Sequence, residues 1–201
     1  YLSDRGAYTE SDIDTDLMRL EQYYGDQGYI NAKIGRPIVD IKPGKGIYLT
    51  IPVEEGQLYH VGQVDADGDL IVLKSEILEA FGVKTGDVMS KLKIHAGMEK
   101  VRNIYMDKGY ANVDINPLTR EEGTVIHITL QIKKGNPVYI DEIRIKGNTK
   151  TRDKVIRREL KVNEGDLYSS TSLKQSRDKL NRLGYFKEVN ISQIPGENEN
   201  T

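Results

Sequence analysis

The feature that most constrains the fold is an internal repeat, built on three helical segments that each end at a glycine. In each segment apolar residues recur at steps of three and four, as on one face of an α-helix. The stripes are formed by Ile13, Leu17, Leu20 and Tyr24, by Ile94, Met98, Val101 and Tyr105, and more loosely by Leu173, Ser176 and Leu180. Gly28, Gly109 and Gly184 follow, and we expect positive φ angles there because the helix must stop without a linker.

The strands between the helices repeat as well and set the domain boundaries. Alternating apolar residues over 47–53 recur 79 positions later over 126–132, and both runs predict strands. We predict three domains, residues 1–56, 57–135 and 136–201, called here the first, middle and third repeat. Each follows the order strand, helix, helix, strand, strand, but the first lacks its opening strand and short helix and the third lacks its closing strand. Because the sequence opens within a repeat, we expect it to be a fragment.

The predicted fold class is α+β, in which each domain has a three-stranded mixed sheet with two helices on one face. Met98 and Tyr105 are predicted core residues of the middle repeat, followed by a strand over 111–115 and a turn over 119–123. Pro52 lies where a strand would need a backbone donor, so we expect the first repeat to be irregular there. Slipped alternation over 186–191 predicts a bulged strand in the third repeat.

Composition argues against several classes of function. The chain has no cysteine, three histidines and a formal net charge of −2, which gives no thiolate chemistry and too little positive charge for nucleic acid. No run approaches the roughly 18 apolar residues of a membrane span, and the start lacks a signal peptide. The segment 65–69 resembles a calcium loop, but the equivalent third-repeat residues 144–148 carry no carboxylate. We predict no catalytic residue, metal site or cofactor.

Four short segments of the third repeat carry the signature of a known domain family. They are Ile145–Thr151, Val155–Leu160, Gly165–Ser169 and Leu180–Phe186. With the order of elements above, they resemble the POTRA domain, which stands in tandem before an outer-membrane β-barrel in the Omp85 proteins. The resemblance covers nearly the whole chain, and the third repeat is similar to the last domain before the barrel. It implies the periplasmic part of an outer-membrane protein.

The resemblance also implies a binding scaffold for unfolded outer-membrane proteins rather than an enzyme. An exposed sheet edge accepts an extended peptide by backbone hydrogen bonding. In this family the strand after the long helix is commonly the available edge, here residues 30–39 and 111–117. The candidate binding residues are Ile30, Ala32, Ile34, Ala111, Val113 and Ile115. The alternatives are a rigid structural spacer and the POTRA region of a related secretion or import transporter.

Two features of the third repeat suggest further partners. Glu164 lies in the loop between the two predicted helices, and its counterpart in the middle repeat is Thr85, so the repeat does not require a carboxylate there. We therefore take Glu164 as the candidate docking residue for an accessory periplasmic lipoprotein. A cluster of basic residues over 146–161 is either a solvated helix face or a contact for anionic lipid headgroups.

Overall fold

The computed structural model describes residues 10–42 and 46–194 of the chain. The turn expected near residues 43–45 and the polar ends at 1–9 and 195–201 lie outside this description. The chain divides into two compact units, which we describe separately. Unit 1 consists of residues 1–65, 82–96 and 118–129, and unit 2 of residues 66–81, 97–117 and 130–201. The division runs through the middle repeat, so each unit contains one meeting point of two repeats.

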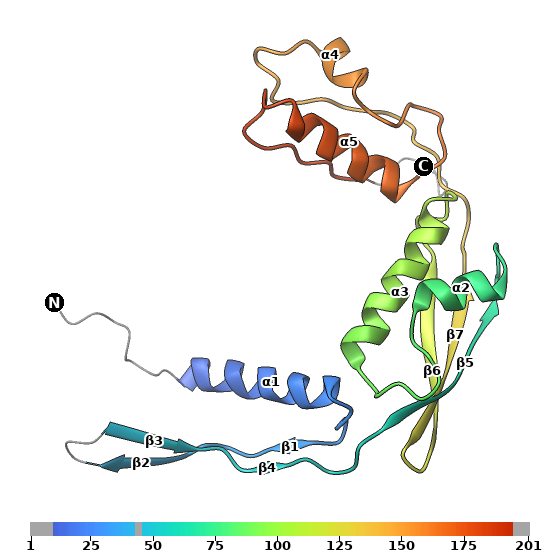
Figure 1. Cartoon of the computed structure of the whole chain (residues 1–201). Helices are drawn as coiled ribbons and strands as arrows, with labels where there is room; N and C mark the ends of the chain where they lie inside the picture. The colour runs from blue at the N-terminus through green and yellow to red at the C-terminus, as the bar shows by residue number, and fades with distance from the viewer. Residues whose placement is uncertain (1–9, 43–45, 195–201) are drawn as a thin grey trace. The chain divides into compact units, whose positions relative to one another are not determined.

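The first repeat has one long helix and two short antiparallel strand pairs (Figure 1). The elements are α1 (Glu10–Asp26), β1 (Lys33–Ile34), β2 (Ile38–Lys42), β3 (Gly46–Thr50) and β4 (Val53–Glu54). Strand β2 pairs with β3, and β1 pairs with β4. The predicted strand over 47–53 is interrupted at residues 51–52, where the Pro52 carbonyl oxygen accepts a hydrogen bond from the Gly35 amide at 2.8 Å. The irregularity expected at Pro52 is confirmed.

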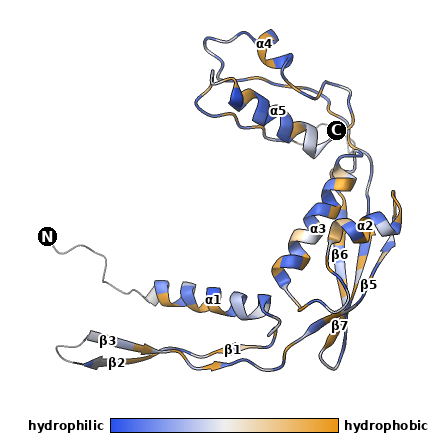
Figure 2. Ribbon diagram, in the orientation of Figure 1, coloured by the Kyte–Doolittle hydropathy of each residue, from blue (hydrophilic) through white to orange (hydrophobic). Residues whose placement is uncertain are grey.

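The middle repeat is the complete one and has the predicted order of elements. They are β5 (His60–Gly68), α2 (Lys74–Phe81), α3 (Lys91–Met106), β6 (Asp114–Glu122) and β7 (Val125–Lys133). The sheet order is β5-β7-β6, which places β7 at the centre. Alternate residues of β7 are buried, and Figure 2 shows the polar and apolar residues mixed along the strands. The α+β fold class is confirmed. Because successive side chains of a strand point to opposite faces, the alternating burial shows that one face of the sheet is covered.

The apolar stripe of α3 faces the core, as predicted, with one exception. Ile94, Val101 and Tyr105 are buried, and the Tyr105 hydroxyl donates to the Asp69 carbonyl oxygen at 3.0 Å. Met98 is only half-buried, so its prediction as a core residue was too strong. One reason lies beside it at Gly97, where a Cβ atom would collide with the Phe81 carbonyl oxygen. The close approach of α2 is thus centred one residue earlier than Met98.

The hairpin after α3 differs from the prediction in position. The strand was expected over 111–115, but β6 begins at Asp114 and continues to Glu122 through the predicted turn. The chain reverses within two residues, at Gly123 and Thr124, and Gly123 has a φ of 63°. Because glycine adopts this conformation without steric cost, a two-residue turn replaces the longer polar loop that the composition suggested.

The third repeat contains two helices, α4 (Asp153–Arg157) and α5 (Ser170–Arg182). Within the described part of this repeat there is no strand, only an isolated bridge between Tyr139 and Leu167. The bulged strand predicted over 186–191 is therefore wrong for this structure. In the middle repeat β7 pairs with both other strands. The described residues of the third repeat hold no counterpart of β7, so the flanking segments lack their central partner.

Candidate functional site

The first candidate site is the outer edge of β6. Because the sheet order is β5-β7-β6, β6 has one neighbouring strand and one free side within the described residues. Of the predicted residues, Ile115 lies in β6 with its side chain buried, whereas Val113, also buried, and half-buried Ala111 precede the strand. The exposed side chains beside them belong to Asp114 and Asn116. The free edge therefore offers backbone groups flanked by polar side chains.

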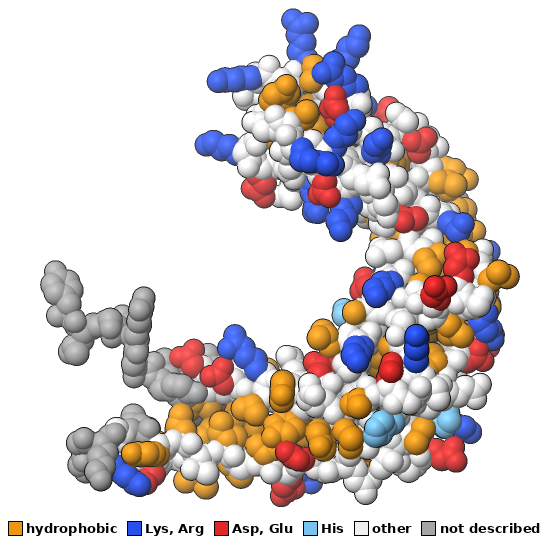
Figure 3. Space-filling model, in the orientation of Figure 1, with side chains coloured by type: hydrophobic (Ala, Val, Ile, Leu, Met, Phe, Trp, Pro, Cys, Tyr) orange, Lys and Arg blue, Asp and Glu red, His pale blue; other side chains and the backbone are white. Residues whose placement is uncertain are grey.

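The second candidate edge, in the first repeat, is split between two short strands. Ile34 lies in β1 and is half-buried, whereas Ile30 and the buried Ala32 precede it. The hairpin β2–β3 exposes several large apolar side chains, namely Ile38 (63%), Val39 (52%), Tyr48 (48%) and Leu49 (39%). Figure 3 shows hydrophobic side chains gathered along this part of the chain. The first repeat thus presents a more apolar edge than β6 does.

Glu164 is exposed, as expected from its loop, but it already has partners within the third repeat. Its carboxylate accepts hydrogen bonds from the Ile143 amide at 2.9 Å and from the Arg157 guanidinium at 3.0 Å. The Arg157 guanidinium also donates to the Ile143 carbonyl oxygen at 2.7 Å. The Ile143 amide and Arg157 hold the pKa of Glu164 below its ordinary value. A hollow of about 240 Å³ adjoins these residues.

The basic cluster of the third repeat is partly neutralised within the chain. Glu159 forms ion pairs with Arg158 at 3.1 Å and with Lys179 at 2.9 Å, and Arg157 pairs with Glu164 at 3.0 Å. Figure 3 shows Lys and Arg side chains projecting from α4 and α5. Exposed ion pairs such as Arg157–Glu164 stabilise little, although the Glu159 side chain is only 17% exposed. They do reduce the positive charge that the surface offers to an anionic partner.

Sequence reasoning missed the contacts between consecutive repeats, which we call the first and second joint. The first joint lies within unit 1 and consists of Asp26, Gly28, Leu58, Tyr59, Val88, Ser90 and Leu92. The second joint lies within unit 2 and consists of Asp107, Gly109, Val138, Leu167, Ser169, Ser170 and Thr171. In each, the end of one long helix contacts the start of the next repeat.

The backbone geometry of the two joints is the same. Gly28 and Gly109 have φ angles of 94° and 95°, which confirms the prediction of positive φ, as does 68° at Gly184. The Gly28 carbonyl oxygen accepts the Tyr59 amide at 2.9 Å, and the Gly109 carbonyl oxygen accepts the Val138 amide at 2.8 Å. Whereas Gly184 is exposed, Gly28 and Gly109 are each buried against the next repeat. Glycine is required here for both its conformation and its lack of a side chain.

A carboxylate near the end of each of the first two long helices reaches the N-terminus of the next long helix. Asp26 Oδ1 accepts hydrogen bonds from the Ser90 hydroxyl at 3.2 Å and from the Leu92 amide at 2.9 Å. At the second joint, Asp107 Oδ1 accepts from the Ser169 and Ser170 hydroxyls, each at 3.1 Å, and from the Thr171 amide at 2.8 Å. Asp107 Oδ2 accepts the Thr171 hydroxyl at 2.6 Å.

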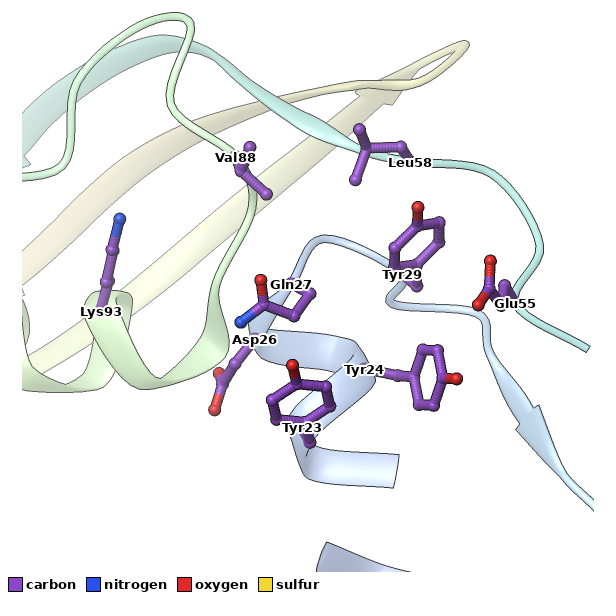
Figure 4. A pocket seen from close by; sticks show the side chains of 9 residues that line it. All are labelled: Tyr23, Tyr24, Asp26, Gln27, Tyr29, Glu55, Leu58, Val88 and Lys93. Atoms are coloured by element: carbon purple, nitrogen blue, oxygen red, sulfur yellow. The ribbon is translucent and has the colours of Figure 1, made fainter. Parts of the chain in front are cut away.

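A cleft of about 700 Å³ lies beside the first joint, within unit 1 (Figure 4). The rings of Tyr23, Tyr24 and Tyr29 line one part of it, in edge-to-face pairs with centroids 6.0 and 6.1 Å apart. Burial, followed by the neighbouring Glu55 carboxylate, raises the pKa of the Tyr24 hydroxyl. Lys93 stands apart from the rings, on α3. The Tyr23 ring itself is 62% exposed.

Residues 10–42 and 46–194 show neither a cluster of His, Cys, Asp and Glu arranged to hold a metal ion nor a helix with the length and apolar character of a membrane span. His127, which accepts a hydrogen bond from the Gln63 amide at 3.0 Å, also lies 3.4 Å from the Glu122 carboxylate. Neither contact brings a nucleophile to the imidazole.

Comparison with known proteins gives consistent relatives for the whole array. The profile of the POTRA family, described as a surface antigen variable number repeat, matches residues 2–56, 59–135 and 138–201. The outer membrane protein assembly factor BamA of Nitratidesulfovibrio vulgaris is 31% identical over 200 residues, and that of Neisseria meningitidis is 29% identical over 199 residues. These alignments cover 96% and 97% of this chain but 25% of each relative, so the chain spans about a quarter of their length.

Solved structures show the same architecture. The crystal structure of Haemophilus influenzae BamA POTRA3-5 superposes with a TM-score of 0.75 at 24% identity, covering 96% of this chain and 79% of that one. The structure of Haemophilus ducreyi BamA lacking POTRA domains 1-3 gives a TM-score of 0.60 at 25% identity, covering 71% of this chain and 27% of that one. The chain belongs to the POTRA family, and its repeats are similar to the POTRA region of Omp85-family outer membrane protein assembly factors.

Proposed function

We propose that this chain is the periplasmic binding and scaffold region of an outer-membrane β-barrel assembly protein, and that it holds unfolded outer-membrane proteins by backbone pairing. POTRA domains of this kind are binding and scaffold domains, not enzymes. The observation that carries the proposal is the free edge of β6, a nine-residue strand with a single neighbouring strand in the described part of the chain. An added strand would extend this sheet without the help of any particular side chain.

The residues of β6 suggest how such pairing is limited. Pro117 lies within the strand and supplies no amide donor. Proline is tolerated at the edge of a sheet and discourages uncontrolled pairing of that edge. A client strand would therefore pair best on either side of Pro117. The more apolar β2 edge of the first repeat would offer a second, less polar place for the same client.

The test is an amide chemical-shift titration of the chain with a synthetic strand peptide from an outer-membrane β-barrel protein. We expect shifts concentrated over residues 114–122, with a second set over 30–42. The matched control is the same peptide with every amide nitrogen of the pairing segment methylated, which keeps every side chain but removes the amide donors of both edges. If both peptides cause equal shifts, the contact is through side chains and backbone pairing is excluded.

We also propose that an accessory periplasmic lipoprotein docks at the third repeat around Glu164. The exposed carboxylate and the adjoining hollow support this, and Arg157 is placed to exchange its ion pair for one with a partner. Replacing Glu164 by Lys would also break two contacts within the repeat, so the milder Glu164→Gln is the better test. Asp178→Asn is the matched control, because Asp178 is another carboxylate of the third repeat paired with an arginine, Arg177, at 3.8 Å.

Binding of a lipoprotein from the same bacterium, measured by calorimetry, should weaken several-fold for Glu164→Gln and remain unchanged for Asp178→Asn. The melting temperature reports separately on the third repeat. Equal affinity for both variants would remove Glu164 from the docking site while leaving the strand-pairing proposal intact.

The second candidate function is a rigid spacer that holds partners at set distances, as part of an assembly factor or of a related secretion or import transporter. The two joints favour it, because each binds consecutive repeats through backbone and side-chain hydrogen bonds rather than through a slack linker. A spacer without client contact would give no specific shifts along β6 in the titration above.

A further inference from the structure

We propose that Asp26 and Asp107 are positioning residues, each of which fixes the direction of the next repeat by capping its long helix from outside. The usual N-cap of a helix is a side chain of the same segment. Here the first turn of the helix is satisfied by two groups, a serine of its own repeat and a carboxylate of the previous repeat. The inference concerns the geometry of the array and does not depend on client binding.

Two pairs of equivalent contacts support the proposal. Ser90 and Ser169 precede α3 and α5, and their hydroxyl oxygens accept the Lys93 amide at 3.2 Å and the Ser172 amide at 3.1 Å. The same hydroxyls donate their hydrogens to Asp26 and Asp107. One serine thus links the cap of its own helix to the carboxylate of the preceding repeat. Moving the repeats apart would disturb the cap as well as the joint.

The carboxylate also binds a helical amide directly, and this contact makes the direction specific. Leu92 and Thr171 are the second residues of α3 and α5, and each donates its amide to the aspartate of the previous repeat. Free amides at a helix N-terminus point along the helix axis and favour a negative charge. Asp26 and Asp107 meet this demand only when the two long helices keep one relative direction.

The helix that carries the carboxylate does not itself require it. The third repeat has Arg182 at the equivalent position, two residues before Gly184, and its helix α5 forms without an aspartate there. A negative charge near a helix C-terminus is in fact unfavourable for that helix. An aspartate at this place in the first two repeats therefore serves the following helix, not its own.

The second joint is built more strongly than the first. Asp107 accepts four hydrogen bonds from residues 169–171, whereas Asp26 accepts two from Ser90 and Leu92. The first joint cannot match it, since Lys91 and Leu92 stand where the second joint has Ser170 and Thr171. We therefore expect Asp107 to restrict motion more than Asp26 does.

The test measures distances between spin labels across each joint. Because the chain has no cysteine, introduced cysteine pairs can be labelled without background. Exposed Lys100 and Lys174 flank the second joint within unit 2, and exposed Glu21 and Thr119 flank the first within unit 1. For each pair the width of the distance distribution is recorded before and after substitution of an aspartate.

Asp107→Ala should broaden the 100–174 distribution at least twofold and leave the 21–119 distribution unchanged. Asp26→Ala should do the reverse, with a smaller broadening. Asp114→Ala, at another exposed aspartate of unit 2, is the matched control and should change neither. Thr171→Val keeps the amide contact but removes the hydroxyl contact with Asp107, so it should give an intermediate width.

Circular dichroism separates loss of the joint from loss of the fold. With helix content retained, broadening across the substituted joint alone supports the positioning role. Unchanged widths in both Asp107→Ala and Asp26→Ala would overturn it. Should Asp107→Ala lose helix content, the decision rests on Thr171→Val, whose unchanged width would likewise overturn the proposal for the second joint.

Discussion

The two joints have the same backbone geometry but are held by different forces. At the first joint, Gly28 is enclosed by aliphatic groups, and a Cβ atom there would stand 2.7 Å from both Leu58 Cδ1 and Val88 Cγ1. At the second joint, Gly109 has a single close neighbour, Leu167, also at 2.7 Å, and the polar contacts of Asp107 are twice as many as those of Asp26. Packing dominates the first joint and hydrogen bonding the second.

A hydrogen-bond relay adds to the first joint and has no counterpart at the second. The buried Tyr59 hydroxyl accepts the Asn31 side-chain amide at 2.9 Å and donates to the Glu121 carboxylate at 3.0 Å. The equivalent residue of the second joint is Val138, which has no hydroxyl. A repeated fold can thus preserve one geometry while its stabilising contacts change. The stability of the first joint should therefore depend on the volume of substituted side chains, and the stability of the second joint on charge and pH.

The largest effect is expected from adding a methyl group to the glycine of each joint. Gly28→Ala meets two side chains and the Tyr59 carbonyl oxygen at 3.1 Å, in addition to the strain of a positive φ. We expect a loss of about 2–4 kcal/mol. Gly109→Ala should cost less, because a flexible leucine can move away. Gly184→Ala should cost about 1 kcal/mol, the conformational strain alone, since nothing lies within 4 Å.

Denaturant unfolding of the three alanine variants checks this order. Equal losses for Gly28→Ala and Gly184→Ala would mean that packing at the first joint contributes nothing. In that case the contrast between the joints would have to rest on their polar contacts alone.

Removal of the carboxylates should give the opposite order. Asp107→Ala leaves the Thr171 amide and the Ser169 and Thr171 hydroxyls without this acceptor, whereas the Ser170 hydroxyl can still donate to Asn103 Oδ1 at 3.3 Å, and we expect a loss of about 1 kcal/mol. Asp26→Ala removes two hydrogen bonds and should cost roughly half as much. Differential scanning calorimetry on the intact chain provides the comparison. A larger loss for Asp26→Ala would contradict the assignment of hydrogen bonding to the second joint.

The relay through Tyr59 should have a smaller effect. Tyr59→Phe keeps the buried ring but leaves the Asn31 amide and the Glu121 carboxylate without their shared partner. We expect the melting temperature to fall by roughly 2–4 °C, as for the loss of a single hydrogen-bonded group in a chain of this size. The second joint has Val138 at this position, so a Phe variant there would not remove a hydroxyl. The matched control is instead Tyr139→Phe, at an exposed ring. Its melting temperature should not change.

The smallest expected effect is a loosening of the second joint at acidic pH. Burial alone would raise the pKa of Asp107, but hydrogen bonds from Thr171, Ser169 and Ser170 outweigh it and leave the pKa below the ordinary value of 3.8. A lowered folded-state pKa means that this stabilisation is fully present above the unfolded value and is lost as pH falls through the folded value. The second joint should therefore be unchanged between pH 7 and 5 and loosen below about pH 4. Spin-label distances at 100–174 report this, and Asp107→Ala should abolish the dependence.

The local pattern of residues was sufficient to predict the helices and the positive φ angles of the glycines that end them. The helix from Ile94 to Tyr105 and the glycine that follows it could be predicted because both depend only on neighbouring residues. The irregular strand at Pro52 could be predicted for the same reason, since proline lacks the backbone donor that a strand needs. The hairpin after α3 was misplaced because polar residues over 119–122 suggested a loop. In an edge strand with one exposed face, such residues are compatible with a strand.

Contacts between residues that are distant in the sequence could not be predicted from local pattern. Asp26 and Ser90 are 64 positions apart, as are Asp107 and Thr171. A signal was nevertheless present, because aspartate stands two residues before the helix-ending glycine in two repeats and serine precedes the following long helix in both. To pair this aspartate with this serine, one must know that the C-terminal end of one long helix meets the N-terminal end of the next.

Amide hydrogen exchange at Leu92 and Thr171 tests most directly whether the carboxylates hold the joints. Both amides lie in the first turn of a helix, where they would exchange rapidly if no acceptor from the previous repeat held them. We predict protection at both, stronger at Thr171, and loss of protection at Thr171 alone in Asp107→Ala and at Leu92 alone in Asp26→Ala. Rapid exchange at both amides in the unmodified chain, or protection that survives both substitutions, would contradict the account.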